Sequence, residues 1–479
     1  MATLIEQHPL YDTLPVGQEV IFTVSNTSVV SSFTNVKFIA EVHISSGNPP
    51  NPSTTTNIVG TFKTTPNNAG VGMFDFRPII ESFVNSDNLA REQSAYKTVV
   101  NTVNSNVPIH LIDKFSGNLN AMRYLFIRFK IEYIDNDPAS STFGDLITTG
   151  IKDSDLYNIF NGYLKFTDVL DLANTPYTQS TGNNFGYPIP EKFTLDLGAG
   201  EFLSNAPTTQ YANIEDYGTI AFLTILTNPS RIRFVYYDST NTQIGTETVL
   251  FSGAATNIST LSETERRLYY LGCFPANLRN WSSIFQGLVT AGTIQGGYYT
   301  IEPLNYANLN FGTTYTFNVN CPNLKGYEPI RLTWLNQWGT WDYYTFNMKS
   351  SKTISTKGST YQQLAGSWNE SAYRLDSFKG GKKSFRVNAT EKITMNTDFV
   401  NESESAWFEE LINSPEVYIL KGFQDDLNSA FLNISALNQY VIPARLTTSS
   451  YTRKTVANDK LMQYTFEVEK SKTLRTQSV

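Results

Sequence analysis

Histidines and carboxylates are the side chains in this sequence whose chemistry could support catalysis or metal binding. A metal site needs several His, Cys, Asp or Glu ligands close together, and His pairs at helical spacing are a common form of it. The three histidines, His8, His43 and His110, lie far apart in the N-terminal quarter and have no cysteine near them. We therefore expect no zinc or iron site and no bound cofactor.

Paired carboxylates could serve a glycoside hydrolase, which places two carboxyl groups roughly 5–10 Å apart across a cleft. Neighbouring acids occur at Glu409/Glu410, Asp425/Asp426 and Asp153/Asp155. Acids that are close in sequence point in different directions on a helix or loop, so we interpret these pairs as solvated surface groups. The sequence accordingly predicts a protein that is not an enzyme, with no catalytic residues.

Two short segments could bind phosphate. Gly198-Ala-Gly200 lacks the third glycine and the helix N-terminus that would hold the phosphate, so a turn between strands is expected. The basic run from Lys379 to Arg386 could contact phosphates or an acidic partner, but we favour a solvated hairpin. The formal net charge of −7 also argues against a dedicated nucleic-acid binder.

Aromatic side chains are concentrated between Arg331 and Met348, which holds three tryptophans around one turn. Apolar residues alternate up to Trp334, and residues 336–339 read as a turn in which Gly339 supplies a positive φ. A helix would fit the Trp spacing, but the glycine and the flanking Thr, Tyr and Phe disfavour it. The segment therefore predicts a β-hairpin.

These aromatics have two interpretations. Cross-strand packing would bury them. Alternatively, their flat faces could form a sugar-stacking platform or anchor an interface, because Trp is enriched in interface hot spots. Trp338, at the turn, is expected to be the exposed one and the best anchor. The candidate interface residues are Trp334, Trp338, Trp341, Tyr343, Tyr344 and Trp407.

Strands are the main secondary structure that the sequence predicts around these residues. The clearest runs from Arg123 to Ile134, where apolar residues alternate with charged ones, so that one face is buried and the other wet. A helix is expected from about Asp153 to Lys165. A second helix is expected from Ser403 to Asn413, where Trp407 and Leu411 form an i,i+4 pair.

The composition also favours strands. Aromatic residues make up 13% of the 479 residues and charged residues only 16%, against roughly 25% in an average domain. We expect a mainly β protein of tandem antiparallel β-sandwich domains, immunoglobulin-like or jelly-roll-like, with a few short helices. The length suggests about three domains. These are an N-terminal sandwich with short helices (1–180), a middle sandwich (185–310) and a C-terminal β-rich domain with one helix (311–479).

Cysteine usage and hydropathy bear on the compartment. Cys273 and Cys321 are the only cysteines, which fits folding in a reducing cytosol. The sequence leaves open whether they form one disulfide bond with each other. The first residues lack the pattern of a secretion signal, and no apolar run approaches the roughly 20 residues that span a bilayer. We expect synthesis in a cytoplasm and no membrane insertion.

Three C-terminal segments carry a family resemblance. Residues 334–346 contain a Leu-Asn-x-x-Gly-x-x-Asp hairpin, residues 408–418 a Ser-Pro-Glu-Val step, and residues 441–446 an Ile-Pro strand followed by Lys460 to Val468. Over roughly Gly272 to Val468 the chain resembles structural proteins of tailed bacteriophages, particularly those of Bacteroidetes-type hosts. Each motif is a packing signature without a known ligand.

The resemblance implies a virion structural protein, made in the host cytoplasm and located in the viral tail, its tip or baseplate, or a connector ring. Its partners would be other virion proteins and copies of itself in a cyclic homo-oligomer. Its mild acidity is compatible with viral DNA passing without specific binding, because like charges repel. The alternative is a receptor- or carbohydrate-binding tail adhesin.

Overall fold

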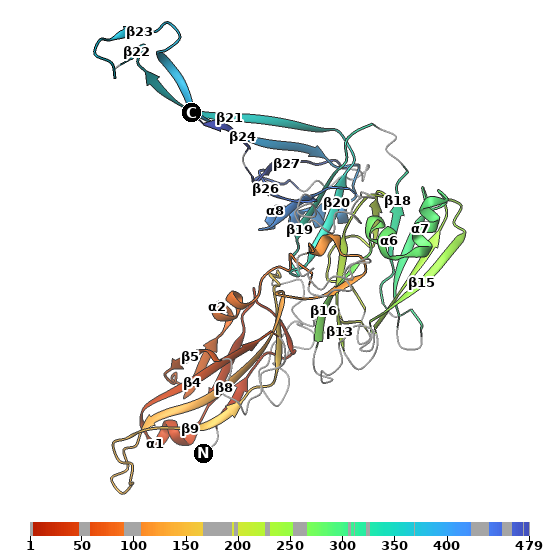
Figure 1. Cartoon of the computed structure of the whole chain (residues 1–479). Helices are drawn as coiled ribbons and strands as arrows, with labels where there is room; N and C mark the ends of the chain where they lie inside the picture. Colours follow the sequence, from red (N-terminus) through yellow and green to blue (C-terminus); the bar gives the residue numbers. More distant parts are fainter. Residues whose placement is uncertain are drawn as a thin grey trace. The chain divides into compact units, whose positions relative to one another are not determined.

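Strands form most of the regular structure of this protein (Figure 1). The computed structural model describes residues 3–46, 58–90, 107–165, 194–195, 200–225, 230–251, 266–304, 308–310, 312–321, 326–367, 369–422, 440–452, 462–472 and 474–478. Strands account for 49% of these described residues and helices for 12%, and the strands form several sheets with mostly antiparallel pairing. The expectation of a mainly β protein with sandwich-like domains is therefore confirmed.

The chain divides into two compact units. Among the described residues, unit 1 holds those of Met1–Cys321 and Leu335–Asp342, and unit 2 holds those of Pro322–Trp334, Tyr343–Gly422 and Ser435–Val479. These limits differ from the three expected domains, because residues on both sides of 180–185 belong to unit 1. The expected boundary between those two domains, residues 181–184, lies outside the described residues.

The N-terminal part of unit 1 is a β-sandwich. One sheet has the order β1 (Leu4–Gln7), β3 (Ile21–Ser25), β6 (Val71–Asp75). The other has the order β2 (Thr13–Pro15), β10 (Tyr157–Phe160), β8 (Met122–Ile134), β4 (Thr34–Ser45), β5 (Ile58–Thr64), and β9 (Leu146–Asp153) also pairs with β8. The ring centroids of Phe22 and Phe74, from the first sheet, lie 5.7 and 5.8 Å from that of Phe129 on β8. The inner faces of the two sheets thus share one core.

Short helical segments connect these strands. They are α1 (Thr27–Ser32), α2 (Arg77–Ile80) and the 3-10 turns η1 (Glu81–Phe83) and η3 (Ile109–Leu111). Pro78 lies in the first turn of α2, where its missing N–H costs no hydrogen bond.

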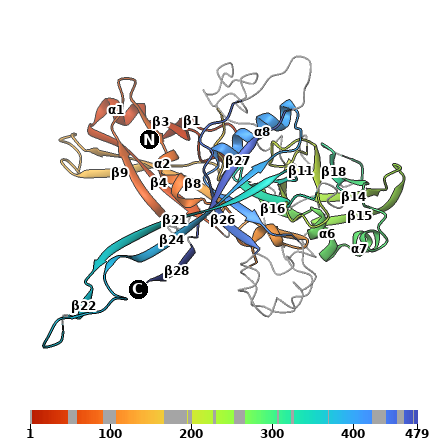
Figure 2. The same ribbon diagram turned by 90° about the horizontal axis from the view of Figure 1, so that it is seen from above.

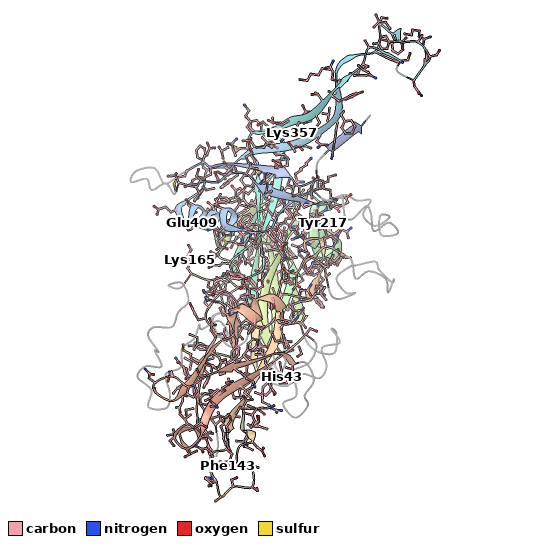
Figure 3. The ribbon with its side chains drawn as sticks, turned by 90° about the vertical axis from the view of Figure 1, so that its left-hand side faces the viewer. His43, Phe143, Lys165, Tyr217, Lys357 and Glu409 are labelled. Atoms are coloured by element: carbon pink, nitrogen blue, oxygen red, sulfur yellow. The ribbon has the colours of Figure 1, made fainter. Side chains whose placement is uncertain are left out.

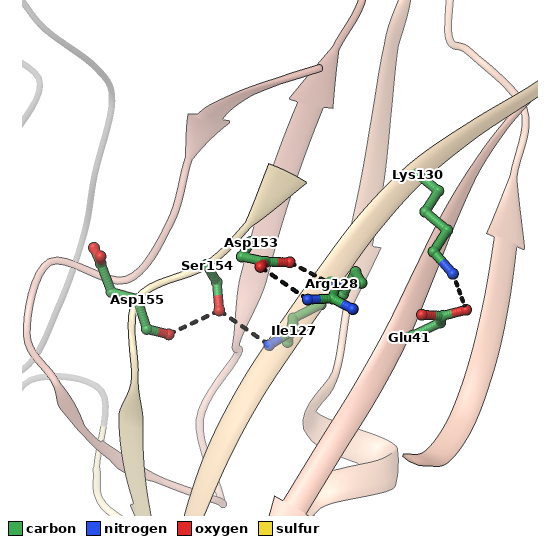
Figure 4. A network of polar contacts seen from close by, with 7 residues as sticks. All are labelled: Glu41, Ile127, Arg128, Lys130, Asp153, Ser154 and Asp155. Atoms are coloured by element: carbon green, nitrogen blue, oxygen red, sulfur yellow. Dashed lines mark hydrogen bonds and ion pairs between the residues drawn. The ribbon is translucent and has the colours of Figure 1, made fainter. Parts of the chain in front are cut away.

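The predicted apolar face of β8 is confirmed, with Leu125, Ile127, Phe129, Ile131 and Tyr133 buried in this core. The opposite face is only partly exposed to water, because Phe126 and Glu132 are buried there. On its outer face, the Arg128 guanidinium forms two hydrogen bonds with the Asp153 carboxylate of β9, at 2.8 and 3.0 Å (Figure 4). These bonds raise the pKa of Arg128 above its usual value. Lys130 forms an ion pair with Glu41 of β4 at 2.5 Å. Such pairs of opposite charge form only when the neighbouring strands are aligned as observed, so they favour this register over a shifted one.

The helix predicted from Asp153 to Lys165 is wrong. Asp153 ends β9, and Tyr157–Phe160 is the strand β10, antiparallel to β8 and parallel to β2. The Ser154 hydroxyl accepts a hydrogen bond from the backbone N–H of Ile127 on β8 at 3.0 Å (Figure 4). All four residues of β10 are buried, and a short apolar run of this kind fits a buried strand as well as a helix.

The rest of unit 1 contains two further sheets. One has the order β11 (Thr194–Leu195), β13 (Thr219–Ile225), β16 (Arg266–Gly272), β7 (Phe115–Gly117). The other has the order β12 (Thr209–Ala212), β18 (Tyr315–Val319), β17 (Tyr298–Leu304), β14 (Ser230–Tyr237), β15 (Gln243–Phe251). Phe202 contacts both sheets, since its ring lies 6.2 Å from that of Phe222 and 4.6 Å from that of Tyr315.

Two helices, α6 (Pro275–Trp281) and α7 (Ser283–Thr290), lie beside β14 and β15 (Figure 2). The Phe285 ring of α7 lies 5.4 Å from that of Tyr236 on β14, so the helix covers part of this sheet. β7 comes from the first expected domain but pairs with β16 of the second. The two expected N-terminal domains therefore share a sheet.

Most of unit 2 is an eight-stranded sheet. Its order is β20 (Trp341–Phe346), β19 (Ile330–Leu335), β25 (Val417–Leu420), β26 (Val441–Leu446), β27 (Thr465–Lys470), β24 (Gly381–Asn396), β21 (Ser350–Gln363), and β28 (Leu474–Ser478) also pairs with β24. Two short strands, β22 (Gly366–Ser367) and β23 (Arg374–Leu375), pair with each other. The helix α8 (Glu402–Asn413) packs on the large sheet, with the Phe408 ring 5.4 Å from that of Phe466.

α8 confirms the helix predicted from Ser403 to Asn413. The Asn401 side chain accepts a hydrogen bond from the backbone N–H of Glu404 at 2.9 Å. In return, the Glu404 carboxylate accepts the backbone N–H of Asn401 at 2.9 Å. This capping box satisfies two donors at the start of the helix.

We expect Asn401→Ala to lower the free energy of unfolding of unit 2 by about 1 kcal/mol, because it removes the acceptor at the helix start. Urea denaturation followed by circular dichroism measures this loss. Asn401→Ser, which keeps an oxygen acceptor, is the control and should retain most of the stability. Equal losses in the two variants would show that the cap contributes nothing.

Candidate interaction surface

The Trp-rich hairpin forms as predicted, with β19 and β20 joined by residues 336–339 and a φ of +72° at Gly339. Its turn belongs to unit 1. Trp338 is only 1% exposed, and its indole N–H donates to the Asn205 side chain at 3.2 Å. The predicted exposure of Trp338 is therefore wrong, because segments of unit 1 that are distant in sequence enclose the turn.

Asn336 closes this turn. Its side-chain oxygen accepts the backbone N–H groups of Trp338 and Thr340 at 3.0 and 3.1 Å. Gly339 lies directly against Asn161, since a β-carbon at Gly339 would be 1.8 Å from the Asn161 carbonyl oxygen. Only glycine fits this close approach with a positive φ.

The other candidate aromatics also take part in intramolecular packing. In unit 1, the Trp341 indole donates to the backbone carbonyl of Asp87 at 2.8 Å. In unit 2, the ring centroids of Trp334 and Trp407 lie 4.8 Å apart. Trp334, Trp341, Tyr343 and Trp407 are buried, and Tyr344 is half-buried. We therefore interpret these side chains as stabilising the fold, and not as a sugar-stacking platform or as interface anchors.

The histidines do not form a site together. Each contacts a different aromatic side chain: His8 with Tyr157, His43 with Phe126, and His110 with Trp341. Across the described ranges, no group of three or more His, Cys, Asp and Glu side chains could hold a metal ion. Cys273 is buried and Cys321 is exposed, and both are free thiols, so the bridge that the sequence left open is not formed.

Two of the three carboxylate pairs, Asp153/Asp155 and Glu409/Glu410, lie in the described residues. Asp153 binds Arg128, whereas the side chain of Asp155 points elsewhere (Figure 4). Glu409 and Glu410 are successive residues of α8. Asp425, Asp426 and most of Gly198-Ala-Gly200 lie outside the described residues.

Asp87 is a buried carboxylate that no sequence motif marks. Its Oδ1 accepts the backbone N–H groups of Leu119, Asn120 and Ala121, and its Oδ2 accepts the Tyr270 hydroxyl at 3.2 Å. Burial raises the pKa of Asp87 to about 6, although these hydrogen bonds lower it. Because the residue is fully buried, we interpret it as a structural latch between segments of unit 1.

The most exposed extended feature of unit 2 is a β-ribbon, residues 350–396, which we call the arm (Figures 1 and 3). β21 and β24 pair along it from Ser350–Met395 to Gln363–Gly381. Among the described strands, β27 and β28 pair with the other side of β24, and this pairing reaches Arg386. Beyond this point the arm is a two-stranded ribbon, a structure that is marginal by itself in water.

The arm ends in a folded tip, of which residues 364–367 and 369–380 are described. The Asp376 carboxylate forms ion pairs with Lys379 at 2.8 Å and Arg374 at 3.3 Å. The backbone N–H of Asp376 donates to the Ala365 carbonyl at 2.8 Å. These contacts give the tip a defined shape.

Large apolar side chains of this tip face solvent. Phe378 is 75% exposed and Leu375 is 72% exposed, and Leu364 and Tyr373 are nearly as exposed. Scattered apolar residues are normal on a protein surface, but several on one short segment indicate an interaction site.

The arm also differs in charge from the rest of the chain. From residue 350 to 396 there are eight Lys or Arg and three Asp or Glu, a net charge of +5. The whole chain has 36 Lys or Arg and 43 Asp or Glu, which leaves 28 and 40 outside the arm, a net charge of −12. The basic run predicted at Lys379 to Arg386 thus lies in an exposed hairpin, as expected.

Neither models of known protein families nor curated protein sequences match this chain. In the described part, no helix is long and apolar enough to cross a membrane.

Proposed function

We propose that this protein is a non-enzymatic structural subunit of a tailed-bacteriophage particle, in the tail, its tip or baseplate, or a connector ring. The arm is the observation that carries the proposal. A two-stranded ribbon is marginal by itself in water, and a surface that covers its apolar tip would stabilise it. Such a ribbon suits a subunit whose function is to bind its neighbours.

Two further observations support this proposal. The aromatic residues that could have served ligand binding are packed inside the two units, which gives rigid β-rich bodies suited to assembly. The resemblance of residues 334–346, 408–418 and 441–446 to phage structural proteins suggests the particle. The net charge of −12 outside the arm is compatible with DNA passing a ring of such subunits without binding.

The alternative, a receptor- or carbohydrate-binding tail adhesin, relied on an exposed aromatic platform at Trp338. Because Trp338 is buried, no described surface favours that function over the structural one. We therefore keep the structural proposal alone.

Mass spectrometry of density-purified particles from infected cells tests this function. The chain should be present in an amount comparable to other minor structural proteins, and a density map of the particle should show it with cyclic symmetry. If the chain stays in the soluble lysate and is absent from purified particles, the proposal fails.

A further inference from the structure

We infer that the arm of one copy of this chain binds the β9 edge of the N-terminal sandwich in a second copy. This inference names the two contacting surfaces, and it rests on the proposed function only in requiring that copies of the chain assemble. Three properties of the two surfaces support it: exposed apolar side chains, open strand edges and opposite charge.

The arm provides the first surface. Phe378 and Leu375 project from its tip into solvent. β21 is the last strand of its sheet, and within the described residues no strand pairs with its outer edge over Ser350–Gln363. A long open edge offers a row of N–H and C=O groups to another chain. Such a row, next to an apolar tip, is suited to adding a strand from a partner.

The second surface consists of β9 and the loop before it, residues 135–155. Among the described strands, β9 pairs only with β8, so its outer edge is open as well. Phe143, Leu146 and Ile151 are exposed along this segment, and Phe143 lies at one end of the sandwich (Figure 3). Apolar side chains are therefore available on both proposed surfaces.

Charge favours the pairing of these two surfaces. Residues 135–155 hold five Asp and one Lys, a net charge of −4, whereas the arm has a net charge of +5. Asp145 and Asp155 are exposed in this segment, and Lys357, Lys382 and Lys383 are exposed or partly exposed on the arm. Opposite charges steer the encounter of two surfaces and disfavour the pairing of arm with arm.

A nucleic acid is the other polyanion that a basic ribbon could bind. The tip argues for protein, because Asp376 already pairs with Arg374 and Lys379, and the side chains left facing solvent there include Phe378 and Leu375. A nucleic-acid surface would instead present its cations to phosphates. Binding of DNA is therefore an outcome against the inference.

Disulfide trapping tests the contact directly. In a Cys321→Ser background, a chain carrying Phe378→Cys is mixed with a longer tagged chain carrying Leu146→Cys. Mild oxidation should produce a disulfide-linked heterodimer on a non-reducing gel. The matched control is Met73→Cys on β6 of the other sheet, since Met73 is 62% exposed and Leu146 is 61% exposed. Equal trapping of the control, or no trapping of Leu146→Cys, would overturn the inference.

Charge exchange gives an independent readout that does not depend on oxidation. Sedimentation velocity of the full chain should show self-association, and Lys357→Glu/Lys382→Glu/Lys383→Glu should weaken it about tenfold. Mixing this variant with Asp145→Lys/Asp155→Lys should restore association. A chain that stays monomeric at every concentration, or an arm variant that loses binding of double-stranded DNA while self-association persists, would refute the inference.

The two proposals can fail separately. If particles contain the chain but neither experiment shows the contact, the structural function stands and the inference falls. If the contact forms in purified protein but particles lack the chain, the inference stands and the phage function falls.

Discussion

Gly339→Ala should lower the free energy of unfolding of unit 1 by roughly 2–5 kcal/mol. The φ of +72° at this position disfavours any residue with a β-carbon by roughly 1–2 kcal/mol. The larger part comes from overlap, because the new methyl would lie 1.8 Å from the Asn161 carbonyl oxygen. Asn161 cannot retreat freely, since its N–H donates to the Ala121 carbonyl at 3.0 Å.

Gly292→Ala is the matched control for this substitution. Gly292 has the same φ of +72°, but a β-carbon there would meet no atom within 4 Å. It should therefore lose only the backbone part, about 1 kcal/mol. Urea denaturation followed by tryptophan fluorescence measures both variants. Equal losses would mean that the hairpin turn does not contact Asn161.

Asp87→Ala should be less stable than Asp87→Asn by about 3 kcal/mol or more. Asparagine keeps an oxygen that can accept the N–H groups of Leu119, Asn120 and Ala121, whereas alanine leaves these partly buried donors without that acceptor. The difference between the two variants isolates these hydrogen bonds, because neither variant carries the charge. Chemical denaturation at one pH provides the comparison, and similar stabilities would refute the role of Asp87 as a latch.

The raised pKa of Asp87 also predicts a pH dependence. Between the unfolded pKa, near 3.8, and the folded pKa, about 6, the folded state holds a proton that the unfolded state has lost. This contribution to stability is fully present below pH 3.8 and is lost as the pH rises through 6. The contribution equals the difference between the folded and unfolded pKa values multiplied by 1.36 kcal/mol per pKa unit, which is roughly 3 kcal/mol.

Asp87→Asn removes this titration and is itself the control. Its stability relative to the wild type should increase from pH 4 to pH 6 and then stay constant. Unfolding free energies measured at intervals over this range provide the test. A constant difference between the two proteins would show that Asp87 titrates alike in the folded and unfolded states.

Local pattern alone predicted several elements correctly. The alternation from Arg123 to Ile134 identified β8, and the spacing of Trp407 and Leu411 identified α8. Residues 336–339 identified the hairpin turn, with a positive φ at Gly339. In each case the residues that specify the structure are neighbours along the chain, so their propensities act within the element itself.

Other features depend on contacts between segments that are far apart in sequence. Trp338 is buried among segments distant in sequence, and Asn205, more than a hundred residues away, contacts its indole. The residues around position 338 hold no pattern that predicts this burial. Residues 157–160 form a strand because the edges of β2 and β8 are there to pair with them. Secondary structure in short apolar runs is decided by such partners, so sequence periodicity could not distinguish strand from helix.

The arm combines both kinds of information. Charge and turn residues are local properties, so the sequence alone predicts a basic, solvated hairpin at Lys379 to Arg386. The extent of this hairpin, from Ser350 to Asn396, and the position of β21 at the edge of its sheet are known only from the folded chain. Strand pairing and exposure depend on which distant segments come to lie alongside, and that information is spread over the whole chain.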